Sequence, residues 1–447
     1  MTTHAETTVK DNPIALIPFL VFLLFYLGLS LWSGDFYSVP MPLAFLVAGA
    51  SAFLLNRPRT TLAEKVECFA RGMGESNIMV MCLIFILAGA FAATAKAAGA
   101  VDATVLICRH LIPEQLILGG FFLISALISL AIGTSCGTIA AVLPIAVGLV
   151  EPMQLSPALM AGAVIGGAMF GDNLSMISDT TIAATRTQGV AMRDKFLVNL
   201  KMVLPVALIA LMLYTVLGLR SATGDTWTTL PTVSGWELLF TVPYLLILLG
   251  AMCGMNVMLL LFSGTVLSIA VGCLSGKLTF WAALASGGSG IQAMSETLIV
   301  ALLAGGLLHM IRHNGGIDFL LTHIERRIRA QWQCEFGVML LVGCVNLFTA
   351  NNTVAIVVSG PIARLLATRY ACDPRRIAGI LDTASCAVQG IIPYGAQLLI
   401  AIGILKNAGI PLHALELIGA LYYPFLLGIA LVGSISLHGM RLRKFAR

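Results

Sequence analysis

Charged residues are scarce in this chain of 447 residues, at 11% against roughly 25% in an ordinary soluble domain. The ten cysteines form no CxxC pair and mostly stand in apolar runs, so neither a zinc framework nor a disulfide scaffold is expected. The sequence also lacks a Ser-His-Asp arrangement, a Walker-type phosphate loop and a histidine cluster. These absences leave a membrane hydrolase, an ATP-driven pump and a resident cofactor without support, and nothing suggests nucleic-acid binding.

Apolar residues dominate what is present. They make up 58% of the chain, and the mean hydropathy is +0.95. Apolar runs long enough to span a bilayer recur from end to end, without the alternation of an outer-membrane barrel. The first run, Pro13 to Trp32, is followed by no small-residue cleavage site, so we interpret it as a retained transmembrane helix. We predict an all-α polytopic membrane protein.

The second half of the sequence repeats the first. Lys96 corresponds to Arg312 at an offset of 216 residues, and Leu143-Pro144 corresponds to Gly360-Pro361 at an offset of 217. The apolar blocks and their interruptions correspond as well. We therefore predict a first repeat over 1–219, a polar connector over 220–235 and a second repeat over 236–447.

Each repeat contains two interrupted apolar blocks. We interpret 115–150 and 335–369 as re-entrant hairpins, and 157–190 and 376–404 as broken helices. If the hairpins do not cross, each half has five crossings, so the two repeats must be inverted.

The basic residues support this topology. With both termini in the cytoplasm, all but five of the 26 Lys and Arg residues lie inside, including the 57–75 loop and the 186–201 segment. The five expected outside are Lys96, Arg109, Arg220, Lys277 and Lys406. We predict a multi-pass protein of the bacterial cytoplasmic (inner) membrane.

Polar residues gather at the four interruptions. Broken backbone is tolerated at membrane depth only inside protein or beside a cavity, so the interruptions predict one site near the midplane. Their carboxylate, amide and hydroxyl oxygens suit a hard cation such as Na⁺, and helix N-termini could instead hold an anionic group. The candidate ion-binding residues are Thr134, Ser135, Asp172, Asn173, Ser175, Ser178, Asp179, Thr180, Asn351, Asn352, Thr353 and Asp382, with Asp172, Asp179, Asn351 and Asn352 as expected Na⁺ ligands.

Asp172 and Asp179 are the main candidates for coupling. A helical conformation would place both on one face with Ser175 between them. Two nearby carboxylates resist joint ionisation, so a cation entering between them would expel a proton. The structural alternative is that they cap the broken helix. Asp382 is a lone carboxylate in an apolar helix, and Arg186 is either a cytoplasmic anchor or a ligand for a substrate carboxylate.

The stretch Gly171 to Thr181, GDNLSMISDTT, resembles the GD-x-x-S-x-x-SDTT signature of NhaC-type sodium/proton antiporters. That family is placed with the wider ion transporter superfamily of inverted repeats and re-entrant hairpins. The resemblance implies a cytoplasmic-membrane transporter that exchanges Na⁺ for H⁺. It also includes carriers proposed for amino acids or for malate and lactate.

Two functions are therefore kept. The first is Na⁺/H⁺ antiport by alternating access, with Na⁺ and H⁺ as the transported partners and the lipid bilayer as surroundings. The second is sodium-coupled transport of a small organic solute such as an amino acid or carboxylate. A channel or structural membrane protein fits less well, because a pore needs no inverted halves. The sequence leaves the oligomeric state open, a homodimer included.

Overall fold

The computed structural model describes residues 12–29, 32, 39–55, 61–103, 113–175, 178–221, 235–253, 255–326, 328 and 330–445. Across these residues all regular secondary structure is helical. Six of the described helices are long and apolar enough to cross a membrane: Ile78–Ala98, Met192–Arg220, Val257–Leu274, Phe280–His313, Gln331–Thr349 and Tyr422–Met440. The chain is thus an all-α polytopic membrane protein. Most of the expected connector, residues 222–234, lies outside the described residues.

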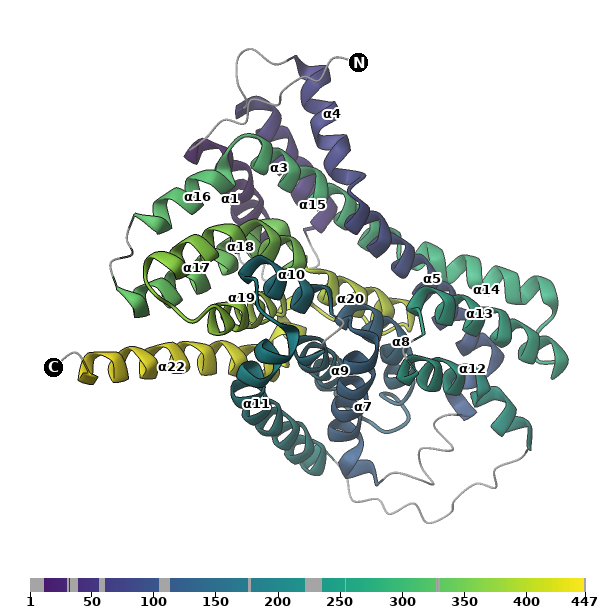
Figure 1. Cartoon of the computed structure of the whole chain (residues 1–447). Helices are drawn as coiled ribbons and strands as arrows, with labels where there is room; N and C mark the ends of the chain where they lie inside the picture. The colour runs from purple at the N-terminus through teal and green to yellow at the C-terminus, as the bar shows by residue number, and fades with distance from the viewer. Residues whose placement is uncertain are drawn as a thin grey trace.

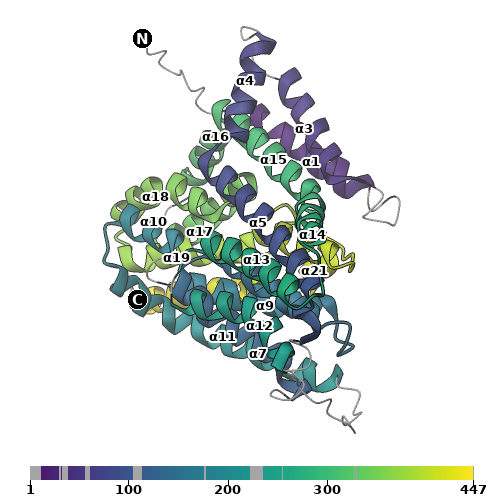
Figure 2. The ribbon, with the colours of Figure 1, turned by 90° about the vertical axis from the view of Figure 1, so that its right-hand side faces the viewer.

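Two groups of outer helices flank an inner group (Figure 1). The first outer group, at the top of Figure 1, contains α1 (Ile17–Leu23), α3 (Met41–Leu55), α4 (Leu62–Met73), α15 (Ser295–His313) and α16 (Gly316–Glu325). The second, at the right, contains α12 (Gly235–Met252), α13 (Val257–Leu274) and α14 (Phe280–Ala293). Helix α5 (Ser76–Ala98) follows α4 and packs along α13 and α14, as the turned view in Figure 2 also shows.

The inner group holds the interrupted segments. Its members are α7 (Ile117–Ile132), α8 (Ser135–Gly148), α9 (Pro157–Leu174), α10 (Asp179–Gln188), α17 (Gln331–Thr349), α18 (Asn352–Arg369), α19 (Pro374–Gln389) and α20 (Ala396–Asn407). Beside them run α11 (Met192–Ser221), the short α21 (Ala414–Gly419) and α22 (Tyr422–Phe445). Short 3-10 segments cover Pro13–Leu16 and Glu114–Leu116, and a π-helical turn covers Leu24–Gly28.

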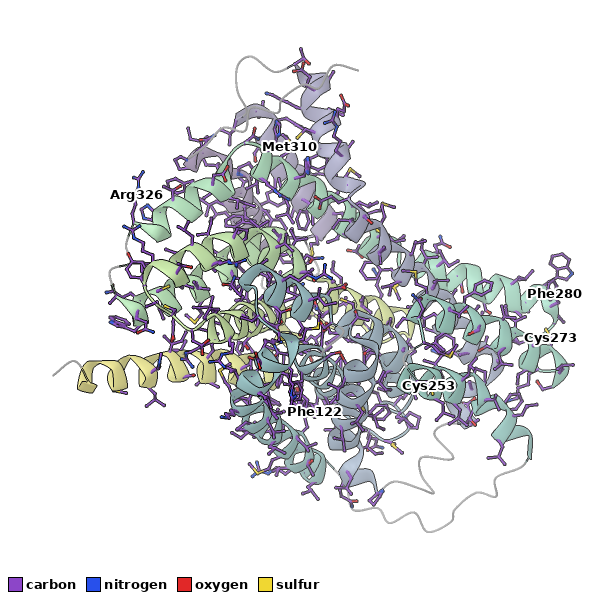
Figure 3. The ribbon with its side chains drawn as sticks, viewed as in Figure 1. Phe122, Cys253, Cys273, Phe280, Met310 and Arg326 are labelled. Atoms are coloured by element: carbon purple, nitrogen blue, oxygen red, sulfur yellow. The ribbon has the colours of Figure 1, made fainter. Side chains whose placement is uncertain are left out.

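Side-chain exposure distinguishes the outer end of one helical arm from the interior of the molecule. Phe280, at the outer end of the arm formed by α13 and α14, is 56% exposed, whereas Phe122 of α7 is 2% exposed. Figure 3 shows Phe280 and Cys273 at the tip of that arm and Phe122 among the inner helices. Large apolar side chains that face outward are what a helix surrounded by lipid requires.

Close packing of α7 against α9 depends on glycine. A Cβ at Gly167 would lie 2.1 Å from the carbonyl oxygen of Phe122, and one at Gly171 would lie 2.2 Å from that of Ala126. Small residues let two helix backbones approach in this way, which is typical of helices that pack in a membrane. The close approach fixes the position of the α9 end, which carries Asp172.

The same contacts recur in the two halves at an offset of 217 residues. Gly133 and Ala350 end α7 and α17 in the left-handed conformation, with φ of 76° and 46°. Ser129 Oγ donates to the carbonyl of Ala168 (2.6 Å), and Asn346 Nδ2 donates to that of Ser385 (2.8 Å). Both bonds tie a hairpin to the broken helix of its own half.

One segment differs from its sequence interpretation. We took 57–75 as a loop, but Leu62–Met73 forms the amphipathic helix α4. Its start is a capping box, in which Glu64 N–H donates to Thr61 Oγ1 (3.3 Å) and Thr61 N–H donates to Glu64 Oε2 (3.0 Å). The T-x-x-E spacing carries that signal in the sequence. Hydropathy alone misses a helix whose outer face is charged.

Candidate functional site

Four helices begin around one small cavity. The residues that precede them are Thr134 before α8, Ser178 before α10, Asn351 before α18 and Gly395 before α20. The cavity has a volume of about 140 Å³. It is lined by Val80, Ile84, Gly133, Thr134, Ser135, Cys136, Asp172, Ser178, Asp179, Thr180, Ala350, Asn351, Asn352, Thr353, Gln389, Ala396 and Gln397. All four interruptions that the sequence predicts therefore meet at this place.

Helices from opposite halves of the chain form the walls of this site cavity. Helix α10 packs on α18, and α8 packs on α20. Each pair combines one limb of a hairpin with the second part of the other half's broken helix. The N-terminal end of a helix carries a partial positive charge, so four such ends make the cavity favourable for carboxylates.

Asp172 is the buried carboxylate of the site cavity, with 7% of its surface exposed. Its Oδ2 accepts a hydrogen bond from the backbone N–H of Ser135 at the start of α8 (3.1 Å). Its Oδ1 accepts one from the hydroxyl of Ser178 (2.5 Å), which precedes α10. The carboxylate thus lies between two helix N-termini and receives two donors, an arrangement that stabilises an anion away from water.

Asp179 lines the same cavity but is exposed, in the first turn of α10. We expected a helical conformation to place it on one face with Asp172 and Ser175. That expectation is wrong in its geometry, because α9 ends at Leu174 and Ser175 has extended backbone. The break, and not a helical face, brings the two carboxylates to one cavity. Thr180 Oγ1 lies 2.9 Å from Ser178 Oγ and extends the hydrogen bonds from Asp172.

The two hairpin tips supply neutral oxygens. Thr134 and Asn351 are the N-caps of α8 and α18, where their side chains accept from the N–H groups of Gly137 (3.4 Å) and Val354 (3.0 Å). Both also line the cavity, together with Ser135, Asn352 and Thr353. Capping and a place at the site are therefore combined in the same residues.

Two glutamines of the second half, Gln389 and Gln397, were not among the candidate ion-binding residues. Gln397 Nε2 donates to Ser135 Oγ (3.1 Å), and Gln389 Nε2 donates to Gln397 Oε1 (3.0 Å) and to the carbonyl of Ala350 (2.8 Å). This chain of hydrogen bonds joins the two halves across the cavity. The repeat contained the signal, because Gln389 and Gln397 stand 217 positions after Asp172 and Thr180.

Three candidates do not line the cavity. Ser175 is buried, and its Oγ donates to the carbonyl of Leu130 in the first hairpin (2.9 Å). Asn173 is buried on another side of α9, and its Oδ1 accepts from Asn199 Nδ2 (2.9 Å). Asp382 forms an ion pair with Lys195, and each of these side chains is 1% exposed.

Lys195 was counted from the sequence among the cytoplasmic basic residues of 186–201. The structure shows that this side chain is fully buried between α9, α10 and α19. Basic residues near the ends of apolar runs do favour the cytoplasm, but charge counting cannot distinguish a surface lysine from a buried one. No spacing in the sequence connects Lys195 with Asp382.

Apart from Cys136, the polar side chains of the site cavity offer carboxylate, amide and hydroxyl oxygens, which are hard donors. A family model described as the Na⁺/H⁺ antiporter family matches residues 41–219 and 225–437 of the chain. The chain belongs to this family. Membership makes it a multi-pass secondary transporter, as the sequence predicts, and not an enzyme.

Curated relatives resemble the chain over most of its length. The malate-2H⁺/Na⁺-lactate antiporter of Bacillus subtilis is 25% identical over 412 residues, which cover 85% of this chain and 86% of that protein. The Na⁺/H⁺ antiporter NhaC of Alkalihalophilus pseudofirmus is 24% identical over 343 residues, 70% of this chain and 74% of that protein. Among solved structures, the YdaH transporter of Alcanivorax borkumensis is 13% identical, with a TM-score of 0.39 over 80% of this chain and 85% of that one.

Proposed function

We propose that the chain is an Na⁺/H⁺ antiporter in which Asp172 binds Na⁺ and H⁺ in alternation. The observation that carries this proposal is a buried carboxylate in a cavity where four interrupted helices begin. Similarity to NhaC antiporters supports Na⁺ and H⁺ as the exchanged ions.

Competition for one carboxylate explains the exchange. A buried carboxylate is costly unless its charge is compensated. The donors on Asp172, the Ser135 N–H and the Ser178 hydroxyl, carry no full positive charge. A proton or a sodium ion supplies it, but both cannot occupy the same carboxylate. Binding of one ion therefore releases the other, which is the basis of antiport.

The size of the cavity suits a small ion with part of its hydration shell. At roughly 30 Å³ of liquid volume per water molecule, about 140 Å³ corresponds to four or five waters. Beside Asp172, the Na⁺ ligands would be completed by Asp179, Thr180, Asn351, Asn352 and Thr353. Because these groups come from both halves, relative movement of the halves would change the ligand set.

Alternating access by two inverted repeats fits this arrangement. The hydrogen bonds that recur at an offset of 217 residues support the repeat. A second cavity of about 580 Å³ lies at the far ends of α8 and α20 and is lined by Lys96, Asp102 and Glu151, among others. Lys96 is one of the few basic residues expected outside, so we propose this larger cavity as the external vestibule. The bias of the other basic residues supports cytoplasmic termini in the inner membrane.

Sodium-coupled transport of an organic solute is the second candidate. The Bacillus subtilis relative whose name includes malate and lactate supports it. In this chain, the amides of Gln397, Asn351 and Asn352 lie at the starts of α20 and α18, where a small carboxylate would find donors. The small volume of the cavity favours an ion or a solute of lactate size over a longer amino acid.

Transport in proteoliposomes distinguishes the two candidates. An imposed Na⁺ gradient should drive proton movement, followed with a pH-sensitive dye, when no organic solute is present. Absence of proton movement together with Na⁺-dependent uptake of labelled lactate or malate would replace antiport with the second candidate.

A further inference from the structure

A second polar cluster lies behind the site cavity, on the other side of the α9 end. It contains Lys195 of α11, Asp382 of α19, Asn173 of α9 and Thr181 of α10, all buried. Lys195 and Asp382 do not line the site cavity. Asp172 and Asn173 are neighbours in sequence, so the end of α9 serves both clusters.

The ammonium group of Lys195 is surrounded by oxygens of three kinds. It donates to Asp382 Oδ2, to the backbone carbonyl of Asn173 (2.9 Å) and to Thr181 Oγ1 (2.9 Å). An ammonium has three N–H donors, so these contacts use all of them. Two of the partners stand on opposite sides of the α9–α10 break, and the third belongs to the second half of the chain.

Carboxylate, carbonyl and hydroxyl oxygens are also the ligands that hard metal cations prefer. The ammonium is a compact positive charge, and here it neutralises a buried carboxylate and satisfies a carbonyl near the end of α9. A bound sodium ion would fill both roles. In addition, Asp382 Oδ1 is buried without a hydrogen-bond partner among the described residues, so a further oxygen is available.

We propose that the Lys195 ammonium is a tethered cation that occupies a second, latent Na⁺ site formed by Asp382, the Asn173 carbonyl and the Thr181 hydroxyl. With this site filled by the chain itself, only the Asp172 site accepts an ion from solution. Lys195 is thus a specificity-determining residue that sets the number of bound Na⁺ ions. The inference rests on the proposed function only in taking Asp172 as the first Na⁺ site.

The expected consequence is a change in the number of bound ions. Lys195→Met keeps an unbranched side chain but removes the charge, which leaves a buried carboxylate that needs a cation. Binding of radioactive sodium to purified protein should rise twofold, from one ion per chain in the wild type to two in Lys195→Met. Lys195→Met/Asp382→Asn should return to one. Lys201→Met, at an exposed lysine of the same helix, is the control and should bind one.

Thermal unfolding in NaCl and in choline chloride gives a second readout. Na⁺ should raise the melting temperature of Lys195→Met more than that of Lys195→Met/Asp382→Asn, in which both charges are gone. The proposal is overturned if Lys195→Met binds no more sodium than the wild type. It is also overturned if Lys195→Met fails to fold in high NaCl while the double variant folds, because Na⁺ then does not replace the ammonium.

Failure of the Asp172 proposal would give a different result. If Asp172 is not a Na⁺ site, Asp172→Asn should bind as much sodium as the wild type. The increase caused by Lys195→Met would still occur in the Asp172→Asn background. The two proposals are therefore tested separately within one set of variants.

Discussion

The two halves of the site cavity have corresponding backbones and different charges. Gly133 and Ala350 end the first limbs of the two hairpins in the same left-handed conformation. At the corresponding positions of the broken helices, the first half has Asp172 and the second has Gln389. Both side chains are buried. The repeat thus supplies a common framework, but the buried carboxylate that we propose for coupling belongs to the first half alone.

The hydrogen-bond partners of Asp172 and Gln389 also differ. Asp172 receives hydrogen bonds from an N–H and a hydroxyl, whereas the Gln389 amide donates to a carbonyl and to another amide oxygen. A carboxylate is therefore stabilised at the first position and would meet acceptors at the second. We therefore expect a carboxylate to function only at the position whose neighbours donate hydrogen bonds to it.

The largest expected effect is that of Asp172→Asn, which removes the charge from the first half. Without the Asp172 carboxylate, a sodium ion in the cavity would lack its paired charge. An unpaired buried charge costs about 3–5 kcal/mol, and each 1.4 kcal/mol is about tenfold in affinity. Na⁺-driven proton flux in proteoliposomes should therefore fall by ~100-fold or more. Asp194→Asn, at an exposed carboxylate in α11, should keep the wild-type rate. Equal rates in the two variants would leave Asp172 with a capping role alone.

Moving the carboxylate to the second half should not restore transport. In Asp172→Asn/Gln389→Asp, the new carboxylate would face the Ala350 carbonyl and the Gln397 amide oxygen. An unpaired buried charge of this kind costs about 3–5 kcal/mol, so the melting temperature in detergent should also fall. Recovery of even a tenth of the wild-type flux would show that the position of the charge within the cavity is unimportant.

The sequence predicts the framework of this site better than its contacts. The interruptions were predictable because polar and small residues are conspicuous within apolar blocks, and all four line one cavity. Gln389 could have been found by applying the repeat offset to Asp172. The partner of Asp382 could not, because Lys195 stands in a basic segment and meets Asp382 only through the packing of α11 on α19. Periodicity and charge counts describe one segment at a time, whereas a buried ion pair depends on two.

Ser178→Ala should weaken Na⁺ binding at the site cavity, but less than Asp172→Asn does. It removes the donor to Asp172 Oδ1 and one hydroxyl oxygen near the cavity, without changing the charge. A hydrogen bond to a charged group contributes about 1.5–3 kcal/mol, so the Na⁺ concentration for half-maximal flux should rise by at least ~10-fold. Ser436→Ala, at an exposed serine of α22, is the control. An unchanged Na⁺ dependence would remove Ser178 from the binding site.

Packing behind the site also distinguishes the halves. Gly167 in α9 corresponds to Ala384 in α19, so the second half accommodates a Cβ where the first half has none. In Gly167→Ala the new methyl would lie 2.1 Å from the carbonyl oxygen of Phe122. Overpacking of this kind costs about 1–3 kcal/mol, and the melting temperature should drop by several degrees. Gly433→Ala in α22, where a Cβ meets nothing within 4 Å, should leave it unchanged or slightly higher.

Glu75 is a further carboxylate of the first half without an acidic counterpart, since Ile291 stands 216 positions later. The Nδ1 of His309 lies 3.9 Å from Oε1 of Glu75. This neighbour lowers the pKa of Glu75. A lowered carboxyl pKa stabilises the fold above the usual value of about 4.3, and the stabilisation is lost as the pH falls through the folded-state pKa.

Glu75→Gln should therefore lower the melting temperature only at neutral pH. Because Glu75 is 43% exposed, solvent screens the interaction, and the change should be small, ~1 °C. At pH values well below 4.3 the variant and the wild type should unfold at the same temperature, because both then carry a neutral side chain. Na⁺/H⁺ exchange should stay at the wild-type rate. A loss of exchange as large as that of Asp172→Asn would extend the charged, functional part of the first half from the site cavity to the start of α5.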